Sequence, residues 1–501
     1  MIKLLIPLLV ISNFSFASDY LLNSDESCYG HKKVPVSTPG GTCVGMVVDK
    51  DAGLKKPRKI IEVSKDNFII TDMVNWNRGN GIVWKLETGD GEPKLTKLFT
   101  GLNLPHGLRI GPDGLIYVGE TNQIFRFDYK KPKETYEVVI DEIPSEGKHP
   151  ISEFIFTKDN RLILNIGAPS DQCLKDNGKA IYPCKQADNE AVLREYSVSE
   201  SGEFTLMGNL AYGLRNSMGI VELENGNIIQ FNNGMDFKEE DGPMEEVNLI
   251  TPGAHYGWPF CYERGKLNKK FKRTFFNRRV PKINCGDYTN PIGLLPAHSA
   301  PLDALLYKGE MFEELKGKVL VSLHGYRKNG QRIIAMDIDD NKKSNDLFKE
   351  IVYGWTAVSG VRPKGAPVGL TIGSQGEVYF VDDKNKTIMV IAKGAKASDV
   401  VVDTVDVSQV DLKLEDFKEI QKNIINKHCI QCHGNFSGDS DKVAKELVES
   451  GLVKAGKPEL SEFFLRLTGE SSSMAMPPGN NEVVTKEDKT LIKNWIESLG
   501  Q

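Results

Sequence analysis

The pattern of hydrophobic and polar positions changes once along this chain. From about Lys50 to Ala392, β-branched and aromatic residues alternate with polar residues in short runs that Gly, Asp and Asn punctuate. This texture predicts many short strands joined by tight turns. From Leu412 onward the apolar residues recur at helical spacing; they are Phe417, Ile420, Ile424 and Ile425, and later Leu491, Ile492, Trp495 and Ile496. We therefore expect a β-rich body followed by a small all-α domain.

One unit recurs in the β-rich body: an apolar strand, a turn of the Pro-Asp-Gly kind, a second apolar strand and a polar turn. The clearest copy is Gly107–Val118, and the others are Ile60–Thr71, Ser152–Ile166, Met218–Gln230, Leu315–Ser322 and Val368–Val381. None of the units can bury its sheet face alone, and closing them into a ring solves this, which predicts a six-bladed β-propeller. A pair of β-sandwiches or a barrel is the alternative. We expect the long loops to gather at one end of the central channel.

The first residues predict export. Lys3 precedes an apolar run over residues 4–11, and the A-x-A-like site Ser15-Phe16-Ala17 follows. This is the order found in a secretory signal peptide that is cleaved about after Ala17. An uncleaved anchor is the alternative, but the run is shorter than the ~20 residues that span a bilayer. We expect residues 1–17 to be a signal peptide, 18–392 the propeller, 393–411 a polar linker and 412–501 the helical domain. The mature protein is then periplasmic and has no transmembrane segment.

Charge and cysteine content narrow the classes of function. The net charge of −5 over 501 residues gives no electrostatic reason to bind nucleic acid. Six of the eight cysteines fall into near pairs, which are candidate disulfides in an oxidising compartment, although six cysteines allow fifteen connectivities. These pairs are Cys28 with Cys43, Cys173 with Cys184, and Cys261 with Cys285.

The other two cysteines belong to a haem-attachment motif. Cys429 and Cys432 are separated by two residues, and His433 follows directly. In this spacing each thiol adds to one vinyl group of a single haem c, and the histidine binds the iron. A redox dithiol or half of a zinc site would also use two such cysteines. The adjacent histidine and the predicted export favour haem.

A second iron ligand is expected downstream. Met476 stands directly before Pro477 and Pro478, which hold the backbone extended and present its thioether rigidly. Met474 is the alternative ligand. A thioether raises the haem potential, which suits a haem that accepts electrons. With its terminal helices, this part of the chain resembles the monohaem cytochrome c family, and we expect it to pass electrons to an acceptor such as a soluble cytochrome or a respiratory-chain component.

Several motifs of the β-rich body resemble those of another family. They are Leu104–Leu108 (LPHGL), Gly213–Gly219 (GLRNSMG), Val247–Pro259 (VNLITPGAHYGWP) and His298–Pro301 (HSAP). Together they resemble the soluble quinoprotein sugar dehydrogenases, including the sorbosone-dehydrogenase-like branch, over most of residues 50 to 392.

This resemblance implies pyrroloquinoline quinone (PQQ) and Ca²⁺ at the mouth of the propeller. Arg215 and Asn216 match the family's cofactor-contacting pair, and an Arg fork is apt for a carboxylate or quinone oxygen. Backbone carbonyls of Gly234 and Met235 match the family's calcium site, and hard cations prefer oxygen ligands. His149 stands where the family has its catalytic base, and imidazole is suited to that role.

Three features depart from the glucose-oxidising relatives. After Gly167 the chain reads Ala168-Pro169-Ser170-Asp171, without the acidic residue that directly follows this glycine in those relatives. Whether Asp171 orients His149 in its place is left open by the sequence. His324 replaces a cofactor-binding lysine, as in the sorbosone-like branch. Only Arg362 and Lys364 stand near the family's paired arginines. The identity of the substrate is therefore not carried over.

The sequence as a whole predicts a quinohaemoprotein dehydrogenase. A sugar or other alcohol would be oxidised at the propeller, and the electrons would pass to the haem of the same chain, because the linker raises the effective concentration of the acceptor near the donor. The main alternative is a cofactor-free propeller that serves as a docking module for a cytochrome c electron carrier. A lactone-hydrolysing propeller that uses Ca²⁺ is a third reading.

Overall fold

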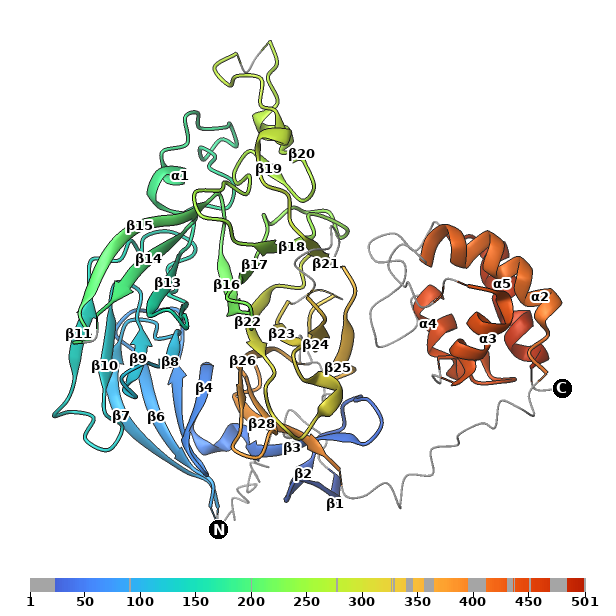
Figure 1. Ribbon diagram of the computed structural model, residues 1–501, viewed down its shortest axis with the longest axis horizontal. Helices are drawn as coiled ribbons and strands as arrows, with labels where there is room; N and C mark the ends of the chain where they lie inside the picture. Colours follow the sequence, from blue (N-terminus) through green and yellow to red (C-terminus); the bar gives the residue numbers. More distant parts are fainter. Residues whose placement is uncertain are drawn as a thin grey trace, which may run out of the picture.

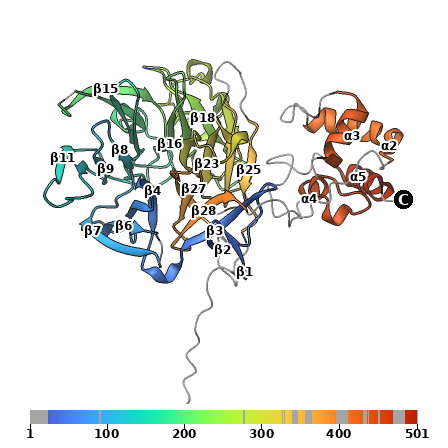
Figure 2. The same ribbon diagram turned by 60° about the horizontal axis from the view of Figure 1, so that its bottom comes forward.

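The computed structural model describes residues 23–89, 92–199, 201–275, 278–325, 327, 329–338, 346–355, 365–394, 411–429, 436, 438–449, 452–468 and 484–499. Six antiparallel sheets surround a common axis, and a group of helices lies beside them (Figures 1 and 2). The fold of the larger part is the expected six-bladed β-propeller. The predicted signal peptide and residues 395–410 of the predicted linker lie outside the described residues.

Five blades consist of four strands each, and within each blade the strands lie side by side in the order in which they occur in the sequence. The first blade consists of β4 (Pro57–Ser64), β5 (Asn67–Asp72), β6 (Gly81–Glu87) and β7 (Lys94–Leu102), and the second consists of β8 (Leu108–Ile110), β9 (Ile116–Gly119), β10 (Ile124–Phe127) and β11 (Glu137–Ile140). The third consists of β12 (Phe154–Phe156), β13 (Arg161–Ile166), β14 (Val192–Val198) and β15 (Phe204–Tyr212), and the fourth consists of β16 (Ser217–Glu222), β17 (Ile228–Asn232), β18 (Glu245–Leu249) and β21 (Gly293–Leu295). The fifth consists of β22 (Pro301–Leu306), β23 (Val319–Leu323), β24 (Arg332–Met336) and β25 (Lys349–Val352).

The sixth blade closes the ring by joining the two ends of the propeller. Its β26 (Pro367–Ile372), β27 (Val378–Asp382) and β28 (Thr387–Lys393) come late in the sequence, whereas β3 (Thr42–Val48) pairs antiparallel with β28. The strands β2 (His31–Lys33) and β1 (Asn23–Cys28) extend this sheet, and a Cys28–Cys43 disulfide ties β1 to β3. Pairing of early with late strands leaves no open edge between the first and last blades.

The prediction for the repeat unit of the fifth blade is wrong, because it misses the inner strand of that blade. The stretch Leu315–Ser322 starts in a short 3₁₀ turn, η4 (Glu313–Leu315), and covers only β23, whereas the inner strand of that blade is β22. The connection from β22 to β23 is longer than a Pro-Asp-Gly turn. A repeat unit with a short turn between its strands therefore does not match this blade, and the prediction misses β22. The other units overlap the first two strands of their blades.

Charged side chains fill the axis of the ring. Lys59 Nζ lies 2.5 Å from Asp303 Oδ1 and 3.2 Å from Glu153 Oε2, and Arg109 Nη2 lies 2.5 Å from Glu153 Oε1. Lys59, Glu153 and Asp303 are buried. Burial alone would raise the pKa of Glu153, but Arg109 and Lys59 outweigh it and lower that pKa. Buried ion pairs therefore link the inner strands of the first, second, third and fifth blades.

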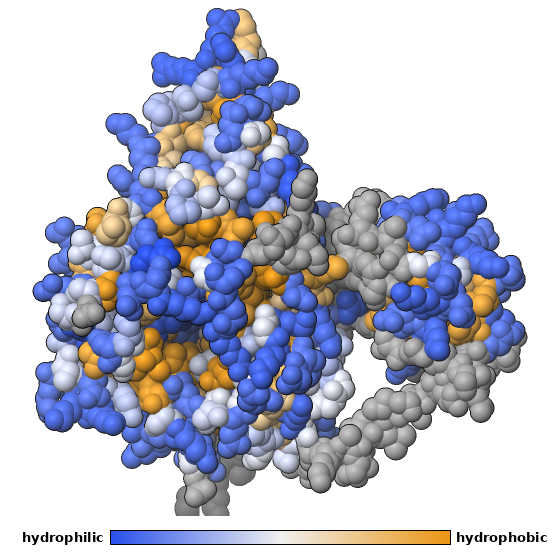
Figure 3. All heavy atoms as spheres, in the orientation of Figure 1, coloured by the Kyte–Doolittle hydropathy of each residue, from blue (hydrophilic) through white to orange (hydrophobic). Residues whose placement is uncertain are grey.

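Two insertions form a lobe above one end of the propeller, at the top of Figure 1. The first includes α1 (Gln186–Asn189) and a Cys173–Cys184 disulfide; the second includes β19 (Cys261–Tyr262), β20 (Lys266–Leu267), η2 (Lys269–Phe271), η3 (Cys285–Asp287) and a Cys261–Cys285 disulfide. The outer surface of this lobe is mainly hydrophilic (Figure 3). All three disulfides have the pairing that the sequence indicated, and they fit an exported protein.

The C-terminal part forms a helical unit with its own core. It contains α2 (Leu414–Ile420), a π-helical continuation η6 (Gln421–Cys429), α3 (Ser440–Glu449), η8 (Pro458–Leu460), α4 (Glu462–Thr468) and α5 (Lys486–Ser498). The expected apolar faces are buried together, and the rings of Phe417 and Trp495 lie 4.7 Å apart. A capping box between Thr485 and Asp488 begins α5. Within the described part of the chain, no helix has both the length and the apolar character needed to cross a membrane.

Of the predicted haem site, the structure describes only Cys429, which is buried at the end of η6. Cys432, His433, Met474 and Met476 lie outside the described residues. Among the described residues, an ion pair between Arg466 of α4 and Glu350 of β25 joins the helical unit to the propeller, and Glu350 also binds Arg332 of β24.

Candidate functional site

The structure brings the five predicted propeller residues to one end of the ring. The inner strand of a blade begins, and its neighbour ends, at the same end, as the pairing of Ser217 with Asn232 illustrates. His149 precedes β12, Arg215 and Asn216 precede β16, and Gly234 and Met235 follow β17. These residues lie under the lobe of insertions, as expected for propeller loops that carry a site.

His149 is held by a single backbone contact. Its Nδ1 lies within hydrogen-bond distance of the carbonyl oxygen of Ala168. Because a carbonyl can only accept, Nδ1 carries the proton and Nε2 keeps its lone pair. Burial and the nearby charge of Arg215 lower the pKa of His149 to about 4. The imidazole is therefore neutral at neutral pH and can accept a proton at Nε2.

Gly167 fixes the distance between His149 and the neighbouring loop. A Cβ added at Gly167 would come within 2.5 Å of the His149 carbonyl oxygen and 2.6 Å of the His149 Cβ. No side chain fits in that space. The glycine directly after β13 thus allows the two loops to pack against each other with His149 between them.

Arg215 is buried and organises the middle of the site. Its Nη1 donates to the carbonyl of Asn233 at 3.1 Å, and its Nη2 lies 2.9 Å from Asp171 Oδ1 and 2.7 Å from Asp236 Oδ2. Its Nε is buried without a hydrogen-bond partner among the described residues. A buried guanidinium N–H left without an acceptor is costly, so this atom fits a site for an added acceptor.

Asn216 lies between the third and fourth blades. Its backbone carbonyl accepts from the N–H of Asn233 at 2.9 Å, and its side-chain oxygen lies 3.4 Å from Asn165 Nδ2. The carbonyl of Arg215 accepts from the N–H of Ala168 at 2.7 Å. The loops that carry His149, Arg215 and Asn216 are therefore joined by backbone hydrogen bonds.

The carbonyl of Ala168, and not the carboxylate of Asp171, orients His149. The carbonyl of Ala168 accepts from the imidazole, whereas the carboxylate of Asp171 binds Arg215 and accepts from the backbone N–H of Asp236 at 2.9 Å. Burial would raise the pKa of Asp171, but the charge of Arg215 outweighs it and the pKa is lowered. Asp171 is an ionised partner of Arg215 and makes no hydrogen bond to the histidine.

Around Gly234 and Met235, a buried carboxyl group supports the predicted calcium turn. The N–H of Gly234 donates to Glu245 Oε2 at 2.5 Å, and the N–H of Ala300 donates to Glu245 Oε1 at 3.2 Å. Burial raises the pKa of Glu245 to about 7. The carbonyl of Met235 accepts from the N–H of Phe237 at 3.1 Å. Among the described residues there is no group of three or more His, Cys, Asp or Glu side chains placed to hold a metal ion.

A second polar cluster at this end was only partly recognised from the sequence. Asp383, which follows β27, binds Arg58, lies 2.8 Å from His324 Nε2 and lies 3.3 Å from Lys56 Nζ. Burial would raise the pKa of Asp383, but His324, Arg58 and Lys56 hold it well below its usual range. The cluster joins the first, fifth and sixth blades. No local signal marks Arg58 or Asp383, because only the closed ring brings them together.

The end of the propeller thus combines a neutral imidazole acceptor with buried cationic side chains. His149 can accept a proton, and Arg215, Arg58 and Lys56 present positive charge near the same end of the axis. Asp171 and Asp236 pair with Arg215, and Asp383 pairs with Arg58 and Lys56. The buried Nε of Arg215, which has no partner among the described residues, is the donor that fits a carboxylate or other acceptor on a ligand.

Comparison with known proteins identifies the family of the propeller. A family described as TrAA12-like matches residues 41–394. A PQQ-dependent sugar dehydrogenase from Hypocrea jecorina (strain QM6a) is 23% identical over 395 residues, which cover 68% of this chain and 86% of that protein.

Solved structures agree on the fold. A Trichoderma reesei protein of Carbohydrate-Active Enzymes Family AA12 superposes with a TM-score of 0.55 and 18% identity, covering 74% of this chain and 100% of that structure. The PQQ domain of a pyranose dehydrogenase from Coprinopsis cinerea, in its holo form, gives 0.54 and 18%, covering 73% and 99%. The family model, which matches residues 41–394, places this chain in the TrAA12-like family.

Proposed function

We propose that this protein is an exported dehydrogenase that oxidises a sugar or other alcohol at a PQQ–Ca²⁺ site and passes the electrons to a haem c on its own C-terminal unit. The observation that carries the proposal is the neutral His149, fixed by the Ala168 carbonyl beside the buried Arg215. The curated relative named above acts on sugars with PQQ, which gives the substrate class.

The residues at this end fit a tricarboxylate cofactor. Arg215, with an unpartnered buried Nε, and the amide of Asn216 would contact it, and Arg58, Lys56 and His324 would supply further positive charge or hydrogen bonds. When bound, PQQ supplies a quinone that accepts a hydride, and Ca²⁺ held by the Gly234 and Met235 carbonyls supplies a Lewis acid.

His149 performs the proton transfer. Oxidation of a secondary alcohol to a carbonyl removes two electrons and two hydrogens, one from the hydroxyl group and one from carbon. Nε2 of His149 takes the hydroxyl proton as the C–H bond breaks, and the hydrogen on carbon leaves as hydride together with both electrons. The contact from Nδ1–H to the Ala168 carbonyl stabilises the imidazolium that results and keeps the ring orientation.

The helical unit would carry the electrons away one at a time. Cys429 and Cys432 would attach the haem, and His433 and Met476, or Met474 in its place, would bind the iron. Cys429 ends a π-helical segment, and such segments are frequent at functional sites. A soluble cytochrome or a respiratory-chain component would then oxidise the haem.

Reconstitution tests this proposal directly. The protein, expressed with haem attachment and exported, is loaded with PQQ and Ca²⁺, and a panel of sugars and alcohols is screened for reduction of the haem by its absorption spectrum. We expect at least one sugar to reduce the haem, and His149→Ala to lower the rate by at least about 100-fold. His31→Ala, which changes a histidine on the outer strand β2, serves as the matched control.

Two results would count against the dehydrogenase. If the protein bound haem but neither bound PQQ nor reduced the haem with any substrate, the propeller would be a docking module for an electron carrier. If PQQ reduction occurred without haem reduction, the oxidation would stand and the internal acceptor would not. A Cys432→Ser variant that still held haem covalently through two thioethers would exclude the proposed attachment.

A further inference from the structure

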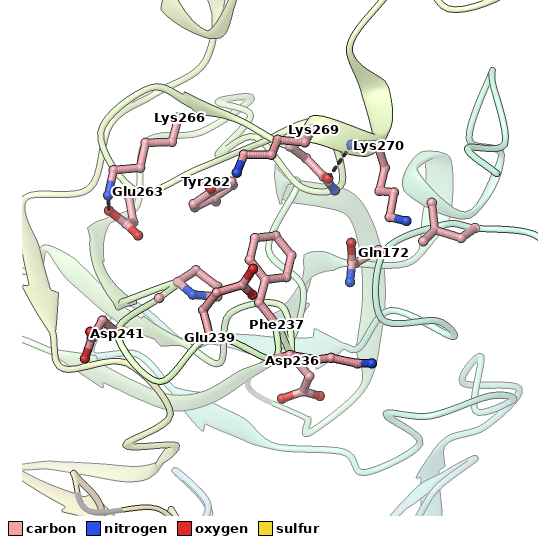
Figure 4. A pocket seen from close by; sticks show the side chains of 15 residues that line it. Gln172, Asp236, Phe237, Glu239, Asp241, Tyr262, Glu263, Lys266, Lys269 and Lys270 are labelled. Atoms are coloured by element: carbon pink, nitrogen blue, oxygen red, sulfur yellow. Dashed lines mark hydrogen bonds and ion pairs between the residues drawn. The ribbon is translucent and has the colours of Figure 1, made fainter. Parts of the chain in front are cut away.

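A pocket of 690 Å³ lies at the base of the lobe of insertions, outside the residues assigned to catalysis (Figure 4). We propose that this pocket binds the non-reacting units of a neutral oligosaccharide whose terminal unit is oxidised beside His149. This inference rests on the proposed function, because it extends the substrate of the same site. The volume is within the range of ~300–1,000 Å³ that is usual for ligand sites.

The pocket shares a wall with the candidate active site. Asp236, which lines the pocket, lies with its Oδ2 2.7 Å from Arg215 Nη2. Gln172, which also lines it, directly follows Asp171, whose Oδ1 lies 2.9 Å from the same Arg215 atom. A ligand in the pocket would therefore be separated by one side chain from Arg215, the residue proposed to contact the cofactor. A chain of sugar units could extend from one site to the other.

The lining combines aromatic faces with a balanced set of charges. Phe237 and Tyr262 are half-buried, with ring centroids 5.3 Å apart, and offer apolar surface to the C–H faces of a sugar ring. Four carboxylates and four ammonium groups surround them; these belong to Asp236, Glu239, Asp241 and Glu263, and to Lys238, Lys266, Lys269 and Lys270. Two of the carboxylates are ion-paired, Asp236 with Arg215 and Glu263 with Lys266. A lining with equal numbers of the two charges supplies both hydrogen-bond acceptors and donors, which suits a neutral polyhydroxylated molecule.

Both walls are fixed in place before any ligand binds. Cys173, bonded to Cys184, lies between the lining residues Gln172 and Leu174, and Cys261, bonded to Cys285, directly precedes Tyr262. Asn268 donates from Nδ2 to the Pro259 carbonyl at 3.0 Å, and its Oδ1 accepts from the N–H of Lys270 at 3.0 Å. A preformed pocket avoids the cost of ordering loops when a ligand binds.

Isothermal titration calorimetry measures binding of oligosaccharides to this pocket independently of catalysis. The full-length protein is titrated without PQQ with neutral linear tetrasaccharides of glucose, xylose and mannose, with the corresponding monosaccharides, and with an anionic tetragalacturonate. We expect at least one neutral tetrasaccharide to bind, and Tyr262→Ala to weaken its binding at least about 10-fold. Tyr182→Ala, which removes an exposed tyrosine from the same lobe but outside the pocket, is expected to leave the binding unchanged.

A second variant keeps the test valid if Tyr262→Ala does not fold. Lys269→Ala changes an exposed side chain at the pocket and is expected to weaken tetrasaccharide binding at least about threefold with an unchanged thermal midpoint. The inference is overturned if no neutral tetrasaccharide binds, if tetragalacturonate binds more tightly, or if Tyr182→Ala weakens binding equally. Activity on a monosaccharide tests the proposed function separately from this pocket. In the enzyme loaded with PQQ and Ca²⁺, we expect Tyr262→Ala to lower kcat/KM for the tetrasaccharide and to leave kcat/KM for the monosaccharide unchanged.

Discussion

At the scale of the single residue, the environment of His149 decides its chemistry. Its ring donates to the Ala168 carbonyl, and burial and the charge of Arg215 both disfavour a second proton. The imidazole is thus prepared as an acceptor, with its tautomer set by the backbone. The same histidine in an open loop would be partly protonated near its ordinary pKa of ~6.5.

The pH dependence of the reaction should reveal this depression. A base must be neutral to accept a proton, so activity is present above the pKa of the folded protein and is lost as the pH falls through it. With a pKa of about 4 for His149, kcat/KM should be level from neutral pH down to about 5 and should fall tenfold per pH unit below 4. A pH profile of kcat/KM measures this. An acid limb near pH 6.5 would show that the imidazole is not held as described.

Gly167 offers a test of positioning without touching an ionisable group. Gly167→Ala places a methyl group within 2.5 Å of the His149 carbonyl oxygen, so the loop that carries His149 must shift. We expect kcat/KM to fall at least about 10-fold, with a loss of unfolding free energy of about 1–3 kcal/mol. Gly89→Ala, where nothing lies within 4 Å of the added Cβ, is the matched control. Full activity of Gly167→Ala would mean that this spacing is not required.

At the scale of the element, closure of the ring depends on strands from opposite ends of the propeller. β3 pairs with β28, and among the described residues a disulfide cross-links Cys43 of β3 to Cys28 of β1. The edge strand of this sheet is β1, next to β2, and the disulfide fastens this edge to β3, the strand that closes the ring.

Removal of this disulfide should destabilise the ring closure. Cys28→Ser/Cys43→Ser opens a 15-residue loop, for which the loss of unfolding free energy is about 3 kcal/mol. Urea denaturation measures the loss, and limited proteolysis should cut between residues 28 and 42 in this variant alone. Cys261→Ser/Cys285→Ser removes a bond in the lobe and should leave the N-terminal strands resistant. Cleavage of the N-terminal strands in both variants would contradict this view of the closure.

At the scale of the whole molecule, an ion pair links the propeller to the helical unit within the part of the chain that the structure describes. Glu350 of β25 binds Arg332 of its own sheet and Arg466 of α4, and the Glu350 and Arg332 side chains are almost fully buried. A carboxylate shared between two guanidinium groups stays paired with one of them when the other leaves. The helical unit can therefore separate without leaving an unpaired charge in the blade.

Arg466→Gln should loosen this contact and spare the propeller. We expect the radius of gyration measured by small-angle X-ray scattering to increase, and the thermal midpoint of the propeller to change by less than about 2 °C, because Glu350 keeps Arg332. Lys493→Gln, which changes an exposed lysine on α5, is the control. An unchanged radius in Arg466→Gln, at both low and high salt, would show that this ion pair does not hold the two units together.

Much of the fold follows from local patterning. Short alternating runs with polar turns predict the strands, the change to helical spacing after Leu412 predicts the helical unit, and near cysteines predict the three disulfides. These features depend on residues that are close in sequence. The inner strand of the fifth blade escaped this reasoning, because β22 is followed by a long connection in place of the short turn that marks the other blades.

The sequence by itself determined the number of blades, the change from strands to helices along the chain and the residue types available for chemistry. Tertiary structure alone decided how they combine: the Ala168 carbonyl orients His149, Asp171 binds Arg215, and Arg58 meets Asp383 although 325 residues separate them. The physical reason is ring closure. Strand and helix patterns depend on neighbours a few positions away, whereas partners across the axis of a propeller are set only when the first and last blades join.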